Sequence, residues 1–314
     1  MELNEPRNPG PSWGFEALNW WDQRLPRPLR NGVSYLGSAI AYASMRSQRK
    51  ASQEYLQAIL GRQPANQECI RQFHAFTNSL LAKLRAGRNN DLQIDWADKA
   101  NEKAGAMMYS DEPILLGTFH VGASDLMGFH IHQTGRKVCM VRQRVENSAD
   151  LEHLISLTAG MVEIIWVNKQ SEVVYAIHQA LGEKRSLAMQ CDRIEHASKT
   201  ESFEFLGENR LFPFTIYRLA NIYGRPVQFC IALPLDSESS FGVYAHDAYI
   251  PEGKSREADL RSAREHFQSV LNWLEGHLRE NPYQWFNFLK LNPIATADTD
   301  LTTCNRVPHQ TKRP

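Results

Sequence analysis

The sequence lacks a long hydrophobic run, a cysteine pattern and an excess of charge, and each absence excludes a class of protein. The apolar segment from Val33 to Met45 contains serine and glycine and is shorter than the roughly 20 residues of a membrane-spanning helix. The five cysteines form no Cys-x-x-Cys pair, which argues against a disulfide framework or a zinc site and favours a reducing compartment. Because the formal net charge is 0, we expect no nucleic-acid partner.

The first 50 residues combine aromatic and basic side chains in a pattern typical of the membrane interface. No export signal is visible, because a basic region followed by an apolar one is missing. From Arg24 to Gln53 there is no acidic residue, whereas tryptophans and arginines surround the apolar segment: Trp13, Trp20, Trp21, Arg24, Arg27, Arg30, Arg46 and Arg49. We predict that residues 1–50 form a helical, membrane-facing arm, attached peripherally or weakly anchored. The alternative is an arm that packs its tryptophans on the domain.

Strand and helix patterns alternate along the rest of the chain. Residues 51–86 predict two helices separated at Pro64. From about residue 111 we predict strands at 114–119, 137–141, 163–167, 186–190 and 227–233, and helices at 125–133, 148–160, 171–182 and 213–223. A long amphipathic helix follows, with Leu260, Phe267, Leu271 and Leu278 inward. The pattern predicts an α/β fold with a mixed, largely parallel central sheet flanked by helices, and a disordered tail at 291–314.

The most informative motif pairs His120 with Asp125, directly after the apolar run 114–116. A histidine at a strand end and a carboxylate in the next helical turn can meet if the chain folds back, and they then make a general base and its orienting acid. Two other histidines also have an acid five positions on. His178 with Glu183 falls in a predicted helix, where the two side chains diverge, and His196 with Glu201 falls in a predicted polar loop.

Two alternatives remain open for His120. In the first, it is a turn histidine and Asp125 caps the following helix. In the second, His120, His130 and His132 hold a metal ion. Against the metal, His130 and His132 fall in a predicted helix, where residues two apart point in different directions.

Four sequence blocks follow one another in an order that is specific as a set. The first is His120-x4-Asp125 and the second is 141–147 (VRQRVEN); the third runs from Asp192-Arg193 through 203–207 (FEFLG) to Pro213, and the fourth is 282–288 (PYQWFNF). Over residues 13–290 this set resembles the lysophospholipid acyltransferase superfamily, in particular its bacterial lipid A biosynthesis branch and related glycolipid acyltransferases. The resemblance implies an acyltransferase domain at 51–290 that moves a fatty acyl chain from a thioester to a lipid hydroxyl.

The resemblance also implies roles for single residues. His120 would be the general base, and Asp125 would accept the other ring N–H, without a covalent acyl-enzyme. The backbone amides of the Gly122–Ala123 turn are candidates for stabilising the oxyanion. Substrate binding is expected at Arg142, Asp192, Arg193, Gly207 and Arg210, where arginine suits phosphate oxygens but also forms ordinary surface ion pairs. Trp285 and Phe288 read as core aromatics.

The same resemblance indicates partners and location. The expected donor is acyl carrier protein, with coenzyme A as the alternative, and no metal or cofactor is implied beyond the thioester. The expected acceptor is a glycolipid or a lipid A-like molecule at the cytoplasmic face of the inner membrane. Because Asp125 stands where lipid A enzymes usually carry glutamate, a glycerolipid acceptor remains the alternative. A non-catalytic lipid-binding protein that keeps the fold is a further alternative.

Overall fold

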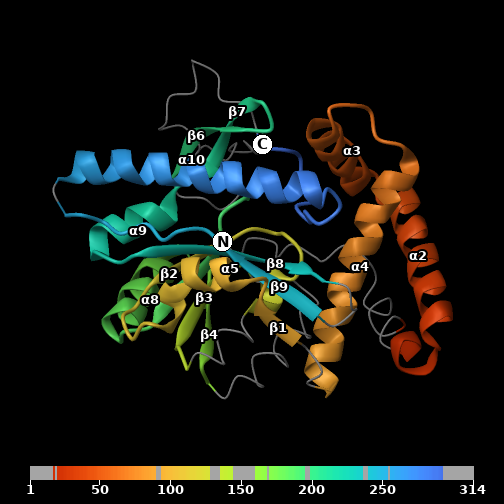
Figure 1. Ribbon diagram of the computed structural model, residues 1–314, viewed down its shortest axis with the longest axis horizontal. Helices are drawn as coiled ribbons and strands as arrows, with labels where there is room; N and C mark the ends of the chain where they lie inside the picture. The colour runs from red at the N-terminus through yellow and green to blue at the C-terminus, as the bar shows by residue number, and fades with distance from the viewer. Residues whose placement is uncertain are drawn as a thin grey trace, which may run out of the picture.

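A seven-stranded sheet runs through the protein (Figure 1). The computed structural model describes residues 17, 20–89, 93–127, 135–143, 160–167, 170–194, 199–235, 240–253 and 255–292. The strand order is β1 (Gln93–Trp96), β9 (Ser240–Ala245), β8 (Val227–Pro234), β2 (Leu115–Thr118), β5 (Ser186–Gln190), β3 (Val138–Arg142) and β4 (Val162–Trp166). Neighbouring strands are parallel except for the antiparallel pair β8–β9. The predicted α/β class with a mixed, largely parallel sheet is confirmed.

The apolar runs located four inner strands and the edge strand β4 well. Strands β2, β3, β4, β5 and β8 begin and end within one residue of their predicted limits. The reason is that inner parallel strands are covered on both faces, so their sequences are nearly continuous apolar runs. Strand β8 follows this rule, since it is buried from Val227 to Leu233.

Helices cover both faces of the sheet (Figure 1). Helices α8 (Gln170–Gly182), α9 (Thr215–Tyr223) and α10 (Arg256–Glu280) share one core with Leu115, Phe229 and Ile231, and α5 (Lys99–Ala104) packs at the other face. Helix α10 is the predicted long amphipathic helix, and its inward side buries Phe267, Val270, Leu271, Leu274 and Leu278. It begins at Ser255, whose side chain accepts a hydrogen bond from the amide of Ala258.

Three helices stand at one end of the sheet: α2 (Arg27–Ser44), α3 (Arg46–Leu60) and α4 (Asn66–Asn89). The two helices predicted in residues 51–86 are confirmed as the greater part of α3 and of α4, and the break between them begins at Gly61, which has a positive φ of 67°. The apolar segment from Val33 to Met45 belongs mainly to α2, which lies beside α4 (Figure 1). In the part of the chain that the structure describes, no helix is long and apolar enough to cross a membrane.

Several elements were not predicted. They include helix α5, the strands β1 and β9, and the hairpin of β6 (Thr200–Phe205) and β7 (Glu208–Pro213). The loop expected around Glu201 is wrong, since Glu201 lies in β6 and pairs with Arg218 at 2.7 Å and Arg264 at 2.5 Å. His196 and most of the predicted helices 125–133 and 148–160 lie outside the described residues.

Candidate active site

His120 lies two residues beyond β2, at the carboxyl edge of the parallel strands. The segment that carries it is held by the fourth sequence block. Phe286 donates its backbone N–H to the carbonyl of His120 (2.6 Å), and Val121 forms an antiparallel bridge with Trp285. His120 is therefore fixed where ligands collect in open α/β sheets.

Gly122 is required by the turn that follows His120. Its φ is +56°, and a Cβ atom here would lie 2.0 Å from the carbonyl oxygen of Ala232. The Gly122 amide donates to Gln284 O and the Ala123 amide donates to Ala232 O, both at 2.8 Å. Because both amides are used within the fold, they are not available to an oxyanion, contrary to the expectation from the sequence.

Among the described side chains, the carboxylate of Asp192 contacts the His120 ring. It follows β5, which pairs in parallel with β2 so that Thr118 faces Gln190. One carboxylate oxygen lies 2.6 Å from His120 Nδ1. The other oxygen accepts from the His120 backbone N–H at 2.9 Å and from Trp285 Nε1 at 2.8 Å. The Asp192 side chain is fully buried, whereas the His120 side chain is 19% exposed.

Asp192 stays ionised despite its burial. Burial alone raises the pKa of this carboxyl group, but the charge of His120 and its hydrogen bond, with the charge of Arg193 and the Trp285 hydrogen bond, lower the pKa to about 2. An ionised carboxylate only accepts hydrogen bonds, so in the neutral ring the proton lies on Nδ1 and the lone pair lies on Nε2. This is the arrangement of a general base that a buried carboxylate orients.

The sequence suggested Asp125 as the partner of His120, and the contact with Asp192 was not predicted. Asp125 lies in the short 3-10 turn η2 (Ser124–Leu126), and its side chain lies outside the described residues, as do His130 and His132. His120 and Asp192 are 72 positions apart, so no local pattern connects them. The signal that could have paired them is the order of strands, since both residues end neighbouring parallel strands.

Arg142 and Arg193 lie at the same edge of the sheet. Arg142 ends β3, and β5 separates β3 from β2. Two strand spacings make a lateral distance of about 10 Å between their ends. Arg193 is exposed beside Asp192 and donates from Nε to Asn287 Oδ1 at 3.0 Å. Both positions suit the predicted binding of substrate.

Arg210 and Gly207 have structural partners in the β6–β7 hairpin. Arg210 is buried and donates from Nη1 to the carbonyl of Asn292 at 2.9 Å. Gly207 and Leu206 have φ values of 76° and 54°, which is the positive pair that a tight two-residue hairpin turn needs. The backbone of this turn is enough to explain the glycine, which lies at the tip of the hairpin.

Trp285 of the fourth sequence block and Asn292 after it hold Asp192 in place through hydrogen bonds. Trp285 is buried against Tyr55 and Phe205, as a core aromatic should be, and its ring N–H also holds Asp192. Asn292 donates from Nδ2 to the Asp192 carbonyl at 3.1 Å, and its own carbonyl accepts from Arg210. Sequence reasoning missed this role, because a tryptophan in an aromatic block is normally explained by packing.

A comparison with family models agrees with the four sequence blocks. Within the described residues, no group of three or more His, Cys, Asp or Glu side chains could hold a metal ion. A search of curated proteins found no match to the chain. A family model described as bacterial lipid A biosynthesis acyltransferase matches residues 11–291, which include every strand and helix named above. The chain therefore belongs to the bacterial lipid A biosynthesis acyltransferase family.

Proposed function

We propose that the protein transfers a fatty acyl chain from an acyl thioester to a hydroxyl group of a lipid A-like glycolipid, with His120 as general base. Membership of the family supports acyl transfer to lipid. The single observation that carries the mechanism is the 2.6 Å contact between His120 Nδ1 and the buried carboxylate of Asp192. A hydroxyl is a weak nucleophile at neutral pH, so a base held in one tautomer is the group that the reaction needs.

In the proposed step, the acceptor oxygen attacks the thioester carbonyl carbon and its proton passes to His120 Nε2. The tetrahedral intermediate then expels the thiolate, which takes the proton from the imidazolium and leaves as a thiol. Atoms and charge balance without a covalent enzyme intermediate or a cofactor. Asp192 stabilises the imidazolium while it carries the proton.

The test replaces His120 by glutamine, whose amide can still donate to Asp192 but cannot act as a base. Turnover should fall by about 10²- to 10⁴-fold with an unchanged melting temperature. The matched control is His178→Gln, which changes an exposed histidine on α8 that also has an acid five positions on; its turnover should stay normal. Near-normal transfer by a folded His120→Gln protein would remove His120 from the chemistry.

The donor and the acceptor are part of the proposal. Acyl carrier protein is the proposed donor, and parallel assays with acyl carrier protein and coenzyme A thioesters compare it with the alternative. Mass spectrometry of lipids from cells with and without the protein identifies the acceptor, because the product is heavier by one acyl group. A glycerolipid product would replace the glycolipid in this proposal while keeping the same step.

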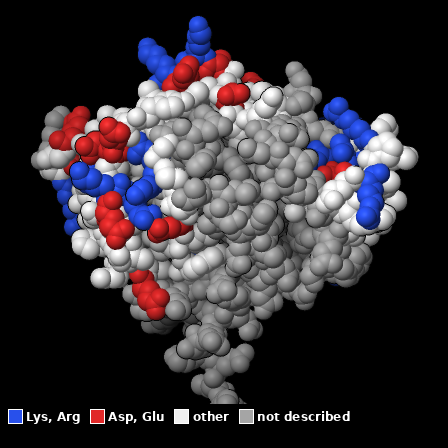
Figure 2. Space-filling view, turned by 90° about the horizontal axis from the view of Figure 1, so that it is seen from below, with Lys and Arg blue, Asp and Glu red and all other residues white. Residues whose placement is uncertain are grey.

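We place the protein at the surface of the inner membrane, attached through α2. The side of α2 that faces the protein carries small or polar residues, since Ser34, Ser38 and Tyr42 are buried there. The opposite side exposes Leu29, Leu36 and Ile40, each by about 60% of its surface. Lys and Arg side chains gather at the end of the molecule where α2 begins (Figure 2). An apolar outer stripe beside cations suits an anionic lipid surface.

A further inference from the structure

A cavity of about 360 Å³ lies between α2, α4 and the loop that follows β8. Basic and amide side chains line its helical side: Arg27, Arg71, His74, Asn78 and Arg85. Among the described residues that line the cavity there is no carboxylate. The cavity therefore contains three guanidinium groups, the side chains that bind phosphate oxygens best.

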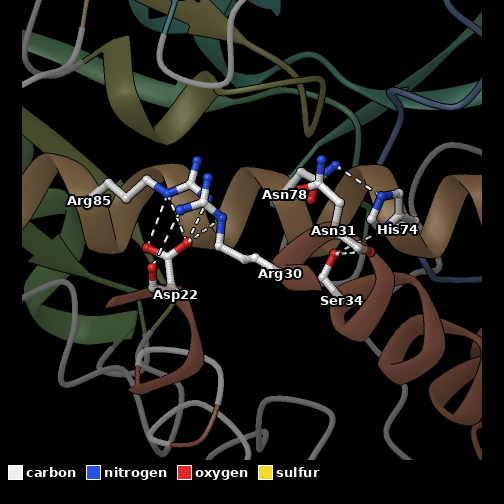
Figure 3. A network of polar contacts seen from close by, with 7 residues as sticks. All are labelled: Asp22, Arg30, Asn31, Ser34, His74, Asn78 and Arg85. Carbon is white, nitrogen blue, oxygen red and sulfur yellow. Dashed lines mark hydrogen bonds and ion pairs between the residues drawn. The ribbon is translucent and has the colours of Figure 1, made fainter. Parts of the chain in front are cut away.

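One wall of the cavity is held in place by a buried ionic network. Arg85 and Arg30 both point at Asp22, between α4 and the start of α2 (Figure 3). Arg85 donates from Nε to both carboxylate oxygens at 3.0 and 3.1 Å and from Nη2 at 2.6 Å, and Arg30 Nε lies 3.4 Å away. In this network two arginines contact one carboxylate. The network fixes Arg85 before any ligand arrives.

The other polar groups of the wall are suited to hydrogen bonding. His74 contacts Ser34 Oγ at 3.2 Å and Asn78 Nδ2 at 3.4 Å, and burial lowers the pKa of its ring, so it is neutral at neutral pH. Arg71 is exposed and lies 6.0 Å from the centre of the Tyr283 ring. Glu68, one helical turn from Arg71, forms its ion pair with Arg62 at 2.6 Å. Arg71 thus lines the cavity without a direct ion pair to Glu68.

The cavity reaches the turn that carries His120. Gly122 lines it, and two elements of the same wall fix Gly122: Ser79 Oγ donates to its carbonyl at 3.0 Å, and Gln284 O accepts from its amide. His120 is two residues away, a chain distance of at most about 7 Å. A group bound at the arginines would therefore belong to a molecule long enough to extend to His120.

We propose that this cavity binds a phosphate group of one of the two co-substrates. This proposal rests on the proposed function. The phosphate group could belong to the acceptor lipid or to the phosphodiester of the donor's pantetheine arm.

The first experiment needs no acyl transfer. Inorganic phosphate is titrated into the full chain at constant ionic strength, and the melting temperature is followed against chloride. We expect phosphate to stabilise the wild-type protein and the control Arg261→Gln, an exposed arginine on α10. Arg71→Gln should lose most of this stabilisation. Arg85 is left intact because its removal would strand Asp22. Equal stabilisation of all three proteins overturns the phosphate site.

The second experiment identifies the source by steady-state kinetics. Arg71→Gln should raise KM by about tenfold or more for one co-substrate, with a smaller change in kcat, while Arg261→Gln changes neither. If the lipid is the source, the effect should vanish with a dephosphorylated acceptor. If the donor is the source, it should vanish with a thioester of pantetheine that lacks phosphate. Unchanged KM values for both co-substrates contradict the inference. A wild-type protein that transfers no acyl group contradicts the proposed function instead, and the titration still decides the site.

Discussion

The carboxylate of Asp192 accepts three hydrogen bonds and has no contact with solvent, so its charge is fixed by its neighbours alone. That charge determines which nitrogen of His120 carries the proton. Asp192→Asn keeps the size of the side chain but can present an amide donor to Nδ1, which moves the ring proton to Nε2. The base would then be blocked without any change in shape.

We therefore expect Asp192→Asn to lower turnover by about 10²- to 10⁴-fold in a protein that still folds. The control Trp285→Phe removes one donor to Asp192 and keeps a buried aromatic ring, so its loss should be much smaller. Turnover with saturating substrates and circular dichroism of both variants provide the comparison. An Asp192→Asn protein with turnover within twofold of wild type would show that another group orients His120.

The site could be predicted in part, and the missing part has a physical cause. His120 was identified because its context is local, namely an apolar strand followed by a turn of small residues. The partnership with Asp192 depends on two strands becoming neighbours in the sheet, and the support from Trp285 depends on a segment more than 90 positions further on. Such contacts are decided by tertiary structure, which spacing in the sequence does not encode.

At the scale of elements, the burial of a strand strongly affects whether its sequence pattern predicts it. Well-buried strands such as β2 and β8 were located closely, although the inner strand β9 was not. The edge strand β1 has only four residues and alternates in burial. The hairpin β6–β7 also alternates, with Ser202 and Glu204 exposed between buried neighbours, and its polar residues imitate a loop. Short, half-covered strands carry too few apolar residues for a pattern to stand out.

Helix α10 contains a histidine that makes stability depend on pH. His266 lies between Tyr217, whose hydroxyl is 2.6 Å from Nδ1, and the carbonyl of Asp247, 2.7 Å from Nε2. Burial is the main cause that lowers its pKa to about 4, helped by His246 and opposed by Asp247. The unfolded chain binds the proton near pH 6.5, so this contribution to stability is present above that pH and is lost as pH falls toward 4.

We expect the melting temperature of the wild type to fall between pH 7.5 and pH 5. The fall should be smaller in His266→Gln, whose amide can serve both partners without titrating. His74 and His277, whose pKa values burial also lowers, are present in both proteins and cancel in the comparison. Calorimetry at the two pH values measures the difference, and equal shifts in both proteins would assign the pH dependence to other groups.

At the scale of the whole molecule, the three N-terminal helices bring together the proposed membrane surface, the basic cavity and the catalytic edge of the sheet. Helix α4 connects them, because it packs against α2 and reaches the His120 turn through Ser79. The contact between α2 and α4 is polar, with Ser34 bound to His74 and Ser38 bound to Thr77 at 3.0 Å. Tyr42 adds an aromatic contact with Phe73, at 5.7 Å between ring centroids, whereas the stripe of Leu29, Leu36 and Ile40 faces away from this contact and is exposed.

The exposed apolar stripe of α2 should bind the membrane surface. Replacing Leu36 and Ile40 together by serine removes the exposed apolar stripe without touching Ser34, Ser38 or Tyr42, so folding should be unchanged. Full burial of each side chain contributes about 1.5–3 kcal/mol, and partial insertion of two should give at least a tenfold effect. Binding to vesicles that contain anionic phosphatidylglycerol should therefore fall about tenfold or more in a sedimentation assay. The control is Val174→Ser on α8, which changes an equally exposed apolar residue.

Salt should weaken wild-type binding through the nearby arginines, and the double variant should keep this salt dependence, because its cations are intact. If the double variant sediments with vesicles as well as the wild type does, α2 is not the attachment surface.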